Sequence, residues 1–135
     1  MEFFAVAELS TSQEILQTLS IDKLSQYCAE IDQVFHIEHE NSGKIYCLWG
    51  EFTVHRQVIN GGVRFSMPHC PNALAWTITT GFAPEPEKVL IHCTINRTEH
   101  DPDFIQSIQD FIQAWKLGLE QHFSDSGKMS QNFIM

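Results

Sequence analysis

The stretch that most constrains the fold runs from Asp101 to Phe123 and has the pattern of one long amphipathic helix. Asp101 and Pro102 are typical of the cap and the first turn of a helix, so its start is well defined. At about 1.5 Å per residue such a helix is roughly 30 Å long. Its large apolar residues recur at steps of three and four and therefore share one stripe: Phe104, Ile105, Ile108, Phe111, Ile112, Trp115, Leu119 and Phe123. A stripe so rich in aromatic rings needs a wide apolar surface to cover it.

The residues before this helix supply such a surface, because most of them alternate between apolar and polar as strands do. We expect strands at 3–9, 33–40, 44–59, 63–67, 73–80 and 88–97, with two short helices after the first strand. The strongest turn signal is Asn60-Gly61-Gly62, which is typical of a tight hairpin. This hairpin predicts that Val58 pairs with Val63, and that Arg56 lies opposite Phe65.

The stretch 44–59 is the longest of the predicted strands. From Tyr46 to Val58 its even positions are apolar except for Gly50 and Arg56, so we expect this face, Leu48 and Phe52 included, to pack against the long helix. Gly50 leaves two alternatives open, a bend within one strand or the meeting point of two shorter strands.

Length and charge limit the classes of function. The 135 residues are 43% hydrophobic and 19% charged, which is typical of one globular domain, predicted at 1–123, with a loose C-terminal tail at 124–135. There are 17 acidic against 8 basic residues, and the net charge of −9 repels phosphate backbones, so we expect no nucleic-acid partner. No run of 18 apolar residues occurs, so we expect no membrane insertion and a cytoplasmic location. The oligomeric state cannot be read from the sequence.

The order of these elements resembles the helix-grip fold of the START/Bet v 1-like (SRPBCC) superfamily, which includes polyketide cyclase-like proteins. The resemblance covers nearly the whole chain and rests on the hairpin region Gly61-Gly62-Val63-Arg64-Phe65, on Asn72-Ala73-Leu74-Ala75-Trp76 entering a strand, and on the terminal helix. It implies an α+β fold in which a curved antiparallel sheet wraps around the long C-terminal helix. It also implies a cavity between the two that usually holds a small hydrophobic ligand. Members of the superfamily include cyclases, dehydratases, carriers of lipids or hormones, and proteins that bind other proteins, and they share no catalytic residue that could be transferred to this chain.

The candidate ligand-binding residues are Arg56, Phe65, Trp76, Phe111 and Trp115. Arg56 lies on the apolar face of its strand, where it could anchor a ligand carboxylate or phosphate. Alternatively, Arg56 reaches water at the strand end or pairs with a local carboxylate. The four aromatic residues either line a cavity or simply fill the core.

No catalytic motif, metal site or cofactor is predicted. The pairs His69-Cys70 and His92-Cys93 place adjacent side chains on opposite faces of an extended chain, so neither pair can easily ligate one ion. The four cysteines form no C-x-x-C pair and are expected to be buried free thiols.

Three functions therefore remain open. The first is binding of a small hydrophobic or amphipathic ligand between the sheet and the helix. The second is a protein-interaction module, chaperone-like or adaptor, with a filled core. The third is an enzyme of the cyclase or dehydratase kind. A cavity above roughly 300 Å³ would favour a ligand, and tightly packed interior rings would favour the interaction module.

Overall fold

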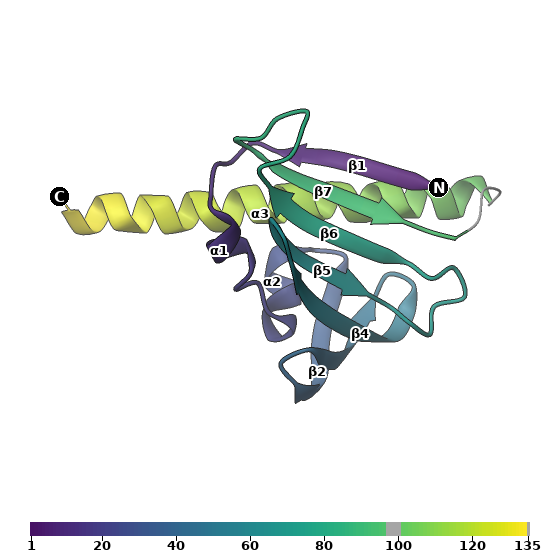
Figure 1. The fold of residues 1–135 in the computed structure, drawn as a ribbon. Helices are drawn as coiled ribbons and strands as arrows, with labels where there is room; N and C mark the ends of the chain where they lie inside the picture. Colours follow the sequence, from purple (N-terminus) through teal and green to yellow (C-terminus); the bar gives the residue numbers. More distant parts are fainter. Residues whose placement is uncertain (97–100, 135) are drawn as a thin grey trace.

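The computed structural model describes residues 1–96 and 101–134, and the side chains of all of these except 125–134. The elements are β1 (Glu2–Ala7), α1 (Gln13–Leu16), the 3-10 turn η1 (Ile21–Lys23), α2 (Leu24–Tyr27), β2 (Ile31–His39), β3 (Ser42–Cys47), β4 (Gly50–Ile59), β5 (Gly62–Ser66), β6 (Ala75–Thr80), β7 (Val89–Thr94) and α3 (Pro102–Ile134). Figure 1 shows them with α3 lying across the sheet.

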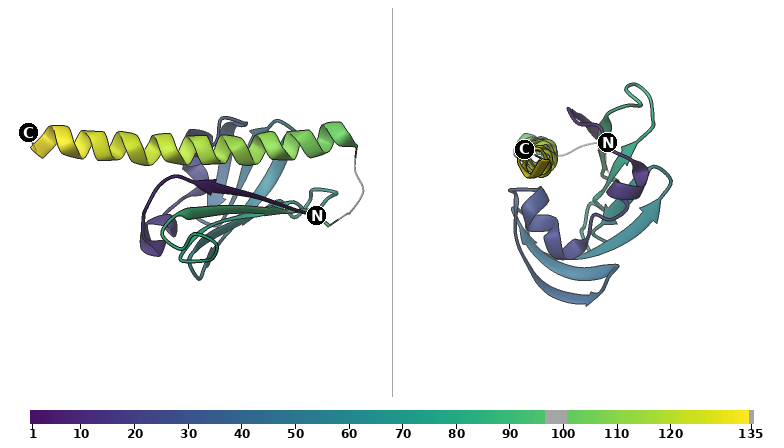
Figure 2. Two further views of the ribbon diagram at one scale, coloured as in Figure 1. Left: turned by 90° about the horizontal axis from the view of Figure 1, so that it is seen from above. Right: turned by 90° about the vertical axis from the view of Figure 1, so that its left-hand side faces the viewer.

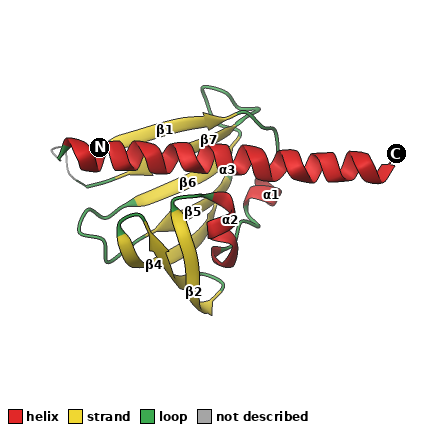
Figure 3. Ribbon diagram, turned by 180° about the vertical axis from the view of Figure 1, so that it is seen from behind, coloured by secondary structure: helices red, strands yellow, loops and turns green. Residues whose placement is uncertain are grey.

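All seven strands form one antiparallel sheet in the order β1-β7-β6-β5-β4-β3-β2. The sheet curls around one side of α3, which is seen end-on in the right-hand view of Figure 2. The short helices α1 and α2 connect β1 to β2 and lie at the end of the sheet where α3 leaves it (Figure 3). This arrangement confirms the predicted α+β helix-grip architecture.

The hairpin between β4 and β5 has the predicted register. Val58 pairs with Val63, and Arg56 pairs with Phe65. Gly61 occupies the turn with a φ of +89°, a conformation that residues with a Cβ rarely adopt. The turn chemistry of Asn60-Gly61-Gly62 was therefore sufficient to set the register of the two central strands.

The stretch 44–59 is two strands rather than one. Cys47 pairs with Gly50, so Leu48 and Trp49 form a tight turn and the chain reverses there. Gly50 makes this turn possible with a φ of +115°. The reversal puts Ile45 opposite Phe52 on the inner face and turns Tyr46 outward. The expectation of one continuous even face was therefore wrong, and Leu48 is 36% exposed.

Helix α3 provides the apolar stripe that the sheet covers. Its fully buried positions are those predicted from the spacing: Ile108, Phe111, Ile112, Trp115 and Leu119. Asp101 caps the helix as predicted, because its carboxylate accepts a hydrogen bond of 2.7 Å from the backbone N–H of Asp103.

The end of α3 differs from the sequence-based boundary. Helix α3 continues to Ile134 and extends beyond the sheet (Figure 1), whereas the sequence indicated a loose tail from residue 124. A single glycine in this region costs a helix only about 1 kcal/mol and is a weak stop signal.

The predicted end of the last strand at Arg97 lies outside the described residues, and β7 itself ends at Thr94.

Candidate functional site

The interior between the sheet and α3 contains the four aromatic residues that the sequence singled out. Phe65 on β5 and Trp76 on β6 are neighbours across the sheet, with ring centroids 5.6 Å apart. Phe111 and Trp115 approach them from α3, with Phe111 5.0 Å and Trp115 6.0 Å from Trp76. All four side chains are at most 1% exposed. The structure thus brings these predicted residues together in one cluster, the interior aromatic cluster.

The polar atoms of the cluster are its most unusual feature. The indole N–H groups of Trp76 and Trp115 are buried and have no hydrogen-bond acceptor among the described residues. Most buried donors in folded proteins have a partner, because an unpaired one costs about 1–3 kcal/mol. Two such donors occur here on rings that touch, one contributed by the sheet and one by α3.

A third tryptophan at the same interface serves as a comparison. Trp49 lies in the β3–β4 turn, and its indole N–H donates to the hydroxyl of Ser107 on α3 at 2.9 Å. Its ring centroid is 4.9 Å from that of Phe111, so it packs at the edge of the cluster. As an odd position of the predicted strand 44–59, Trp49 would lie on the face opposite the long helix, so the pattern gave no reason to expect it at this interface. Gly50, taken as a boundary between two strands, is the sequence signal that would have placed Trp49 in a turn.

The guanidinium of Arg56 bonds to groups of the protein itself and not, as its apolar strand face suggested, to a space for a ligand. Its Nε donates to the carbonyl of Leu19 at 2.7 Å, and its Nη1 donates to Oδ1 of Asn41 at 3.0 Å. Its Nη2 donates to the carbonyl of Gln17. All three guanidinium nitrogens are therefore engaged by the segment after α1 and by the β2–β3 turn. Although Arg56 is paired with Phe65 in the strand ladder, its charged group belongs to this polar junction and not to the interior aromatic cluster.

An open groove follows the seam between β1 and α3. It has a volume of about 280 Å³ and is lined by Phe3, Phe4, Ala5, Gln109, Ile112 and Gln113. Phe3 pairs with Cys93, and Cys93 pairs with Trp76, so the three residues form one row on the inner face of the sheet. At about 4.8 Å per strand, the groove begins roughly 10 Å from Trp76.

The described thiols and histidines are dispersed over the fold. Among the described residues, no three His, Cys, Asp or Glu side chains gather as potential ligands. All four cysteines are free, and Cys28, Cys47 and Cys93 are buried whereas Cys70 is partly exposed. Burial raises the pKa of the Cys28 and Cys93 thiols to about 12, so both stay protonated near neutrality.

Within the described part of the chain, no helix is long and apolar enough to cross a bilayer.

Comparison with known proteins identifies the fold. No family profile matches the sequence, and no curated protein matches it. Among solved structures, the protein XoxI from Bacillus cereus is 17% identical, with a TM-score of 0.66 over 93% of this chain and 97% of that one. An uncharacterised protein from Bacillus thuringiensis is 15% identical, with a TM-score of 0.57 over 86% and 96%.

A START superfamily protein from Mycobacterium smegmatis is 11% identical, with a TM-score of 0.60 over 92% of this chain and 97% of that one. At these identities the likeness concerns the backbone arrangement and not the residues of a site. The similarity extends over nearly the whole length of both chains, so it includes the sheet, the short helices and α3 together. The protein therefore has a START-like helix-grip fold.

Proposed function

We propose that this protein binds a small amphipathic molecule between the sheet and α3, with an oxygen atom of the ligand accepting from the indole N–H groups of Trp76 and Trp115. The observation that carries the proposal is the pair of buried donors for which the described residues supply no acceptor. Their ring centroids are 6.0 Å apart, so both donors belong to one part of the interior, where one carboxylate or carbonyl group could accept from both. The apolar part of such a ligand would lie against Phe65 and Phe111.

The groove at the β1–α3 seam supports this proposal, because it offers a route to the interior. Helix α3 borders the groove with Gln109, Ile112 and Gln113, and β1 borders it with Phe3 and Ala5. A ligand entering here would reach the row of Phe3, Cys93 and Trp76 on the inner face. The helix-grip architecture also supports ligand binding, since it places a curved sheet and a long helix around one apolar space.

Close packing of the interior rings favours a second candidate, a protein-interaction module. The rings of Phe65, Trp76, Phe111 and Trp115 touch one another at centroid distances of 5.0–6.0 Å, which is the spacing of a filled core. In that case a ligand could enter only if the rings moved apart. The enzyme alternative gains no support from this cluster, because none of its four side chains is an acid or base near neutral pH.

Native mass spectrometry of the protein isolated from its own host distinguishes the two candidates. We expect a bound molecule that is released on unfolding, and whose rebinding quenches or shifts tryptophan fluorescence. Trp76→Phe and Trp115→Phe keep an aromatic ring but remove the donor, so each should weaken rebinding about tenfold, the value of one hydrogen bond.

Trp49→Phe is the matched control, because the N–H of Trp49 already has Ser107 as its acceptor. This variant should rebind the molecule as tightly as the wild type. Absence of any bound molecule, or equal effects of all three substitutions, would refute ligand binding at the two indoles and leave the interaction module.

A further inference from the structure

The face of the sheet that points away from α3 carries a second, polar groove. It has a volume of about 390 Å³ and lies between the β2–β3 turn and strands β4 and β5. The residues that matter for its chemistry are His39, Ser42, His55, Gln57, Arg64 and Ser66. We name it the outer groove. It is separated from the interior aromatic cluster by the thickness of the sheet.

The strand register explains why these side chains lie together. His55 pairs with Ser42 on one side and with Ser66 on the other, so these three form a row across β3, β4 and β5. In the neighbouring row, Gln57 pairs with Arg64. Side chains in such rows lie about 4.5–5.5 Å apart at Cβ and can converge on one small ligand.

The charge of the outer groove is opposite to that of the protein. The chain has 17 acidic and 8 basic residues, yet none of the acidic residues that the structure describes lines the groove. Arg64 is partly buried, and its guanidinium has no hydrogen-bond or ion-pair partner among the described residues. The carboxylate of Glu38 contacts the lining, because the hydroxyl of Ser42 donates to its Oε2 at 3.4 Å.

A second arginine adds to this positive charge. Arg56 borders the groove, and its three acceptors are two backbone carbonyls and an amide oxygen, none of which neutralises the guanidinium. The outer groove therefore has a local positive potential that attracts anions.

The available donors define the kind of anion. Arg64 offers a planar fork that matches two oxygens of one group. Nδ1 of His39 accepts from the backbone N–H of Asn41 at 3.1 Å, so the proton of the neutral ring is on Nε2 and can be donated. Ser66 and Gln57 add neutral donors at the same rows. A tetrahedral oxyanion, with several oxygens pointing in different directions, uses this arrangement best.

We propose that the outer groove binds the phosphoryl group of a small molecule, with Arg64 as its principal ligand. Inorganic phosphate and a phosphate monoester share this chemistry, and the experiment separates them. A nucleic acid is disfavoured because the rest of the chain is acidic, so the site serves a compact anion and not a polyanion.

The test is a titration with inorganic phosphate and with phenyl phosphate at constant ionic strength, in which binding is monitored by the NMR chemical shifts of the backbone amides. We expect a Kd of roughly 1 mM or tighter for at least one of them. The amides that shift should be those of His55, Arg64 and Ser66. If only phenyl phosphate binds this tightly, the ligand is a phosphate ester, and if both do, the phosphoryl group alone is sufficient.

Arg64→Gln should weaken binding at least tenfold, as expected for losing one charge-assisted contact. Lys44→Gln is the matched control, because it removes the same charge from the same outer face, on β3 outside the groove. Equal weakening by the two variants, shifts that map elsewhere, or no binding of either compound would overturn the proposal.

Discussion

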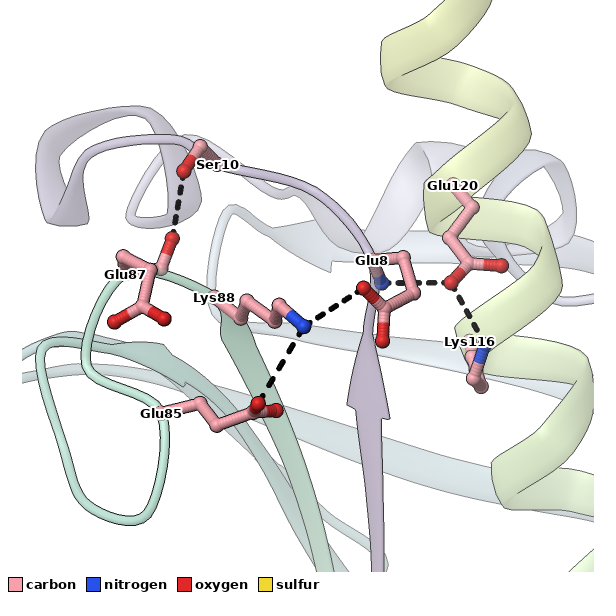
Figure 4. Close-up of polar contacts among 7 residues, drawn as sticks. All are labelled: Glu8, Ser10, Glu85, Glu87, Lys88, Lys116 and Glu120. Atoms are coloured by element: carbon pink, nitrogen blue, oxygen red, sulfur yellow. Dashed lines mark hydrogen bonds and ion pairs between the residues drawn. The ribbon is translucent and has the colours of Figure 1, made fainter.

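Glu8 and Glu120 are 112 positions apart in the chain, yet the backbone N–H of Glu8 donates to Oε2 of Glu120 at 2.7 Å. The same oxygen accepts from Nζ of Lys116, also at 2.7 Å. Figure 4 shows that the side chain of Glu8 continues the network to Lys88, at 2.9 Å, and from there to Glu85. Helix α3 is thereby tied to the end of β1 and, through it, to the β6–β7 loop.

This contact predicts a pH-dependent contribution to stability. Burial by itself would raise the pKa of Glu120, but the hydrogen bonds from Lys116 and from the Glu8 N–H outweigh it and lower the pKa. A carboxylate with a lowered pKa stabilises the fold above its unfolded pKa of about 4.3, and this stabilisation is lost as the pH falls through the folded value. Glu120→Gln should therefore cost about 1 kcal/mol at neutral pH and progressively less below about pH 4.3.

Urea unfolding of wild type and E120Q across this pH range measures the effect. Glu51→Gln, which changes an exposed carboxylate on β4, should match wild type at every pH. A difference between E120Q and wild type that stays constant down to acidic pH would contradict a role for the charge.

Arg56 and Arg64 should differ strongly in how much the fold depends on them. Arg56→Met leaves the carbonyls of Gln17 and Leu19 without their donors, so it should destabilise the fold by roughly 2–4 kcal/mol. Arg64→Met removes a side chain without a partner among the described residues, so its cost should be below about 0.5 kcal/mol. Chemical denaturation of the two variants makes the comparison. If Arg56→Met proved as stable as wild type, the junction between β4 and the segment after α1 would not depend on the guanidinium.

The cysteines predict a simple labelling pattern. Burial raises the pKa of Cys28 and Cys93 to about 12 and also raises that of Cys47, and the thiolate is the form that reacts. Cys70 is partly exposed. A thiol-specific disulfide reagent at about pH 8 should therefore modify one thiol quickly and three only on unfolding. Cys70→Ser should abolish the fast phase, and a fast phase that survives in this variant would show that a buried cysteine is accessible.

The comparison of sequence and structure shows which signals are local. The register of β4 and β5 followed from Asn60-Gly61-Gly62, and the buried stripe of α3 followed from its spacing, because neighbouring residues determine both features. The turn at Leu48 and Trp49 is marked only by Gly50, and the apolar even positions on both sides of it imitate one long strand. Periodicity alone cannot separate these two cases.

The candidate site was predictable to a similar extent. The four aromatic residues of the interior cluster were identified because they are large and lie on apolar faces. The partners of Arg56 could not be predicted, since two of its acceptors are backbone carbonyls in an irregular segment and leave no mark in the sequence. The outer groove was missed because it is formed by polar residues of four strands, β2 to β5, which a search for apolar faces treats as solvent-exposed.

Gly118 predicts an unusual response to alanine. In the middle of a helix, alanine is normally more stable than glycine by about 1 kcal/mol. Here a Cβ at position 118 would lie 2.6 Å from the carbonyl carbon of Tyr27 and closer still to its oxygen, so α3 and the end of α2 would have to separate. The steric cost of about 1–3 kcal/mol or more should exceed the helix preference.

Gly118→Ala should therefore destabilise the protein, although it improves the helix considered by itself. Gln109→Ala, an exposed position on the same helix, is the control and should be neutral or slightly stabilising. Unfolding by urea, together with far-ultraviolet circular dichroism to monitor helix content, gives the sign of both changes. If Gly118→Ala raised the stability as Gln109→Ala is expected to do, the close approach of α2 to α3 could not be the reason for glycine at this position.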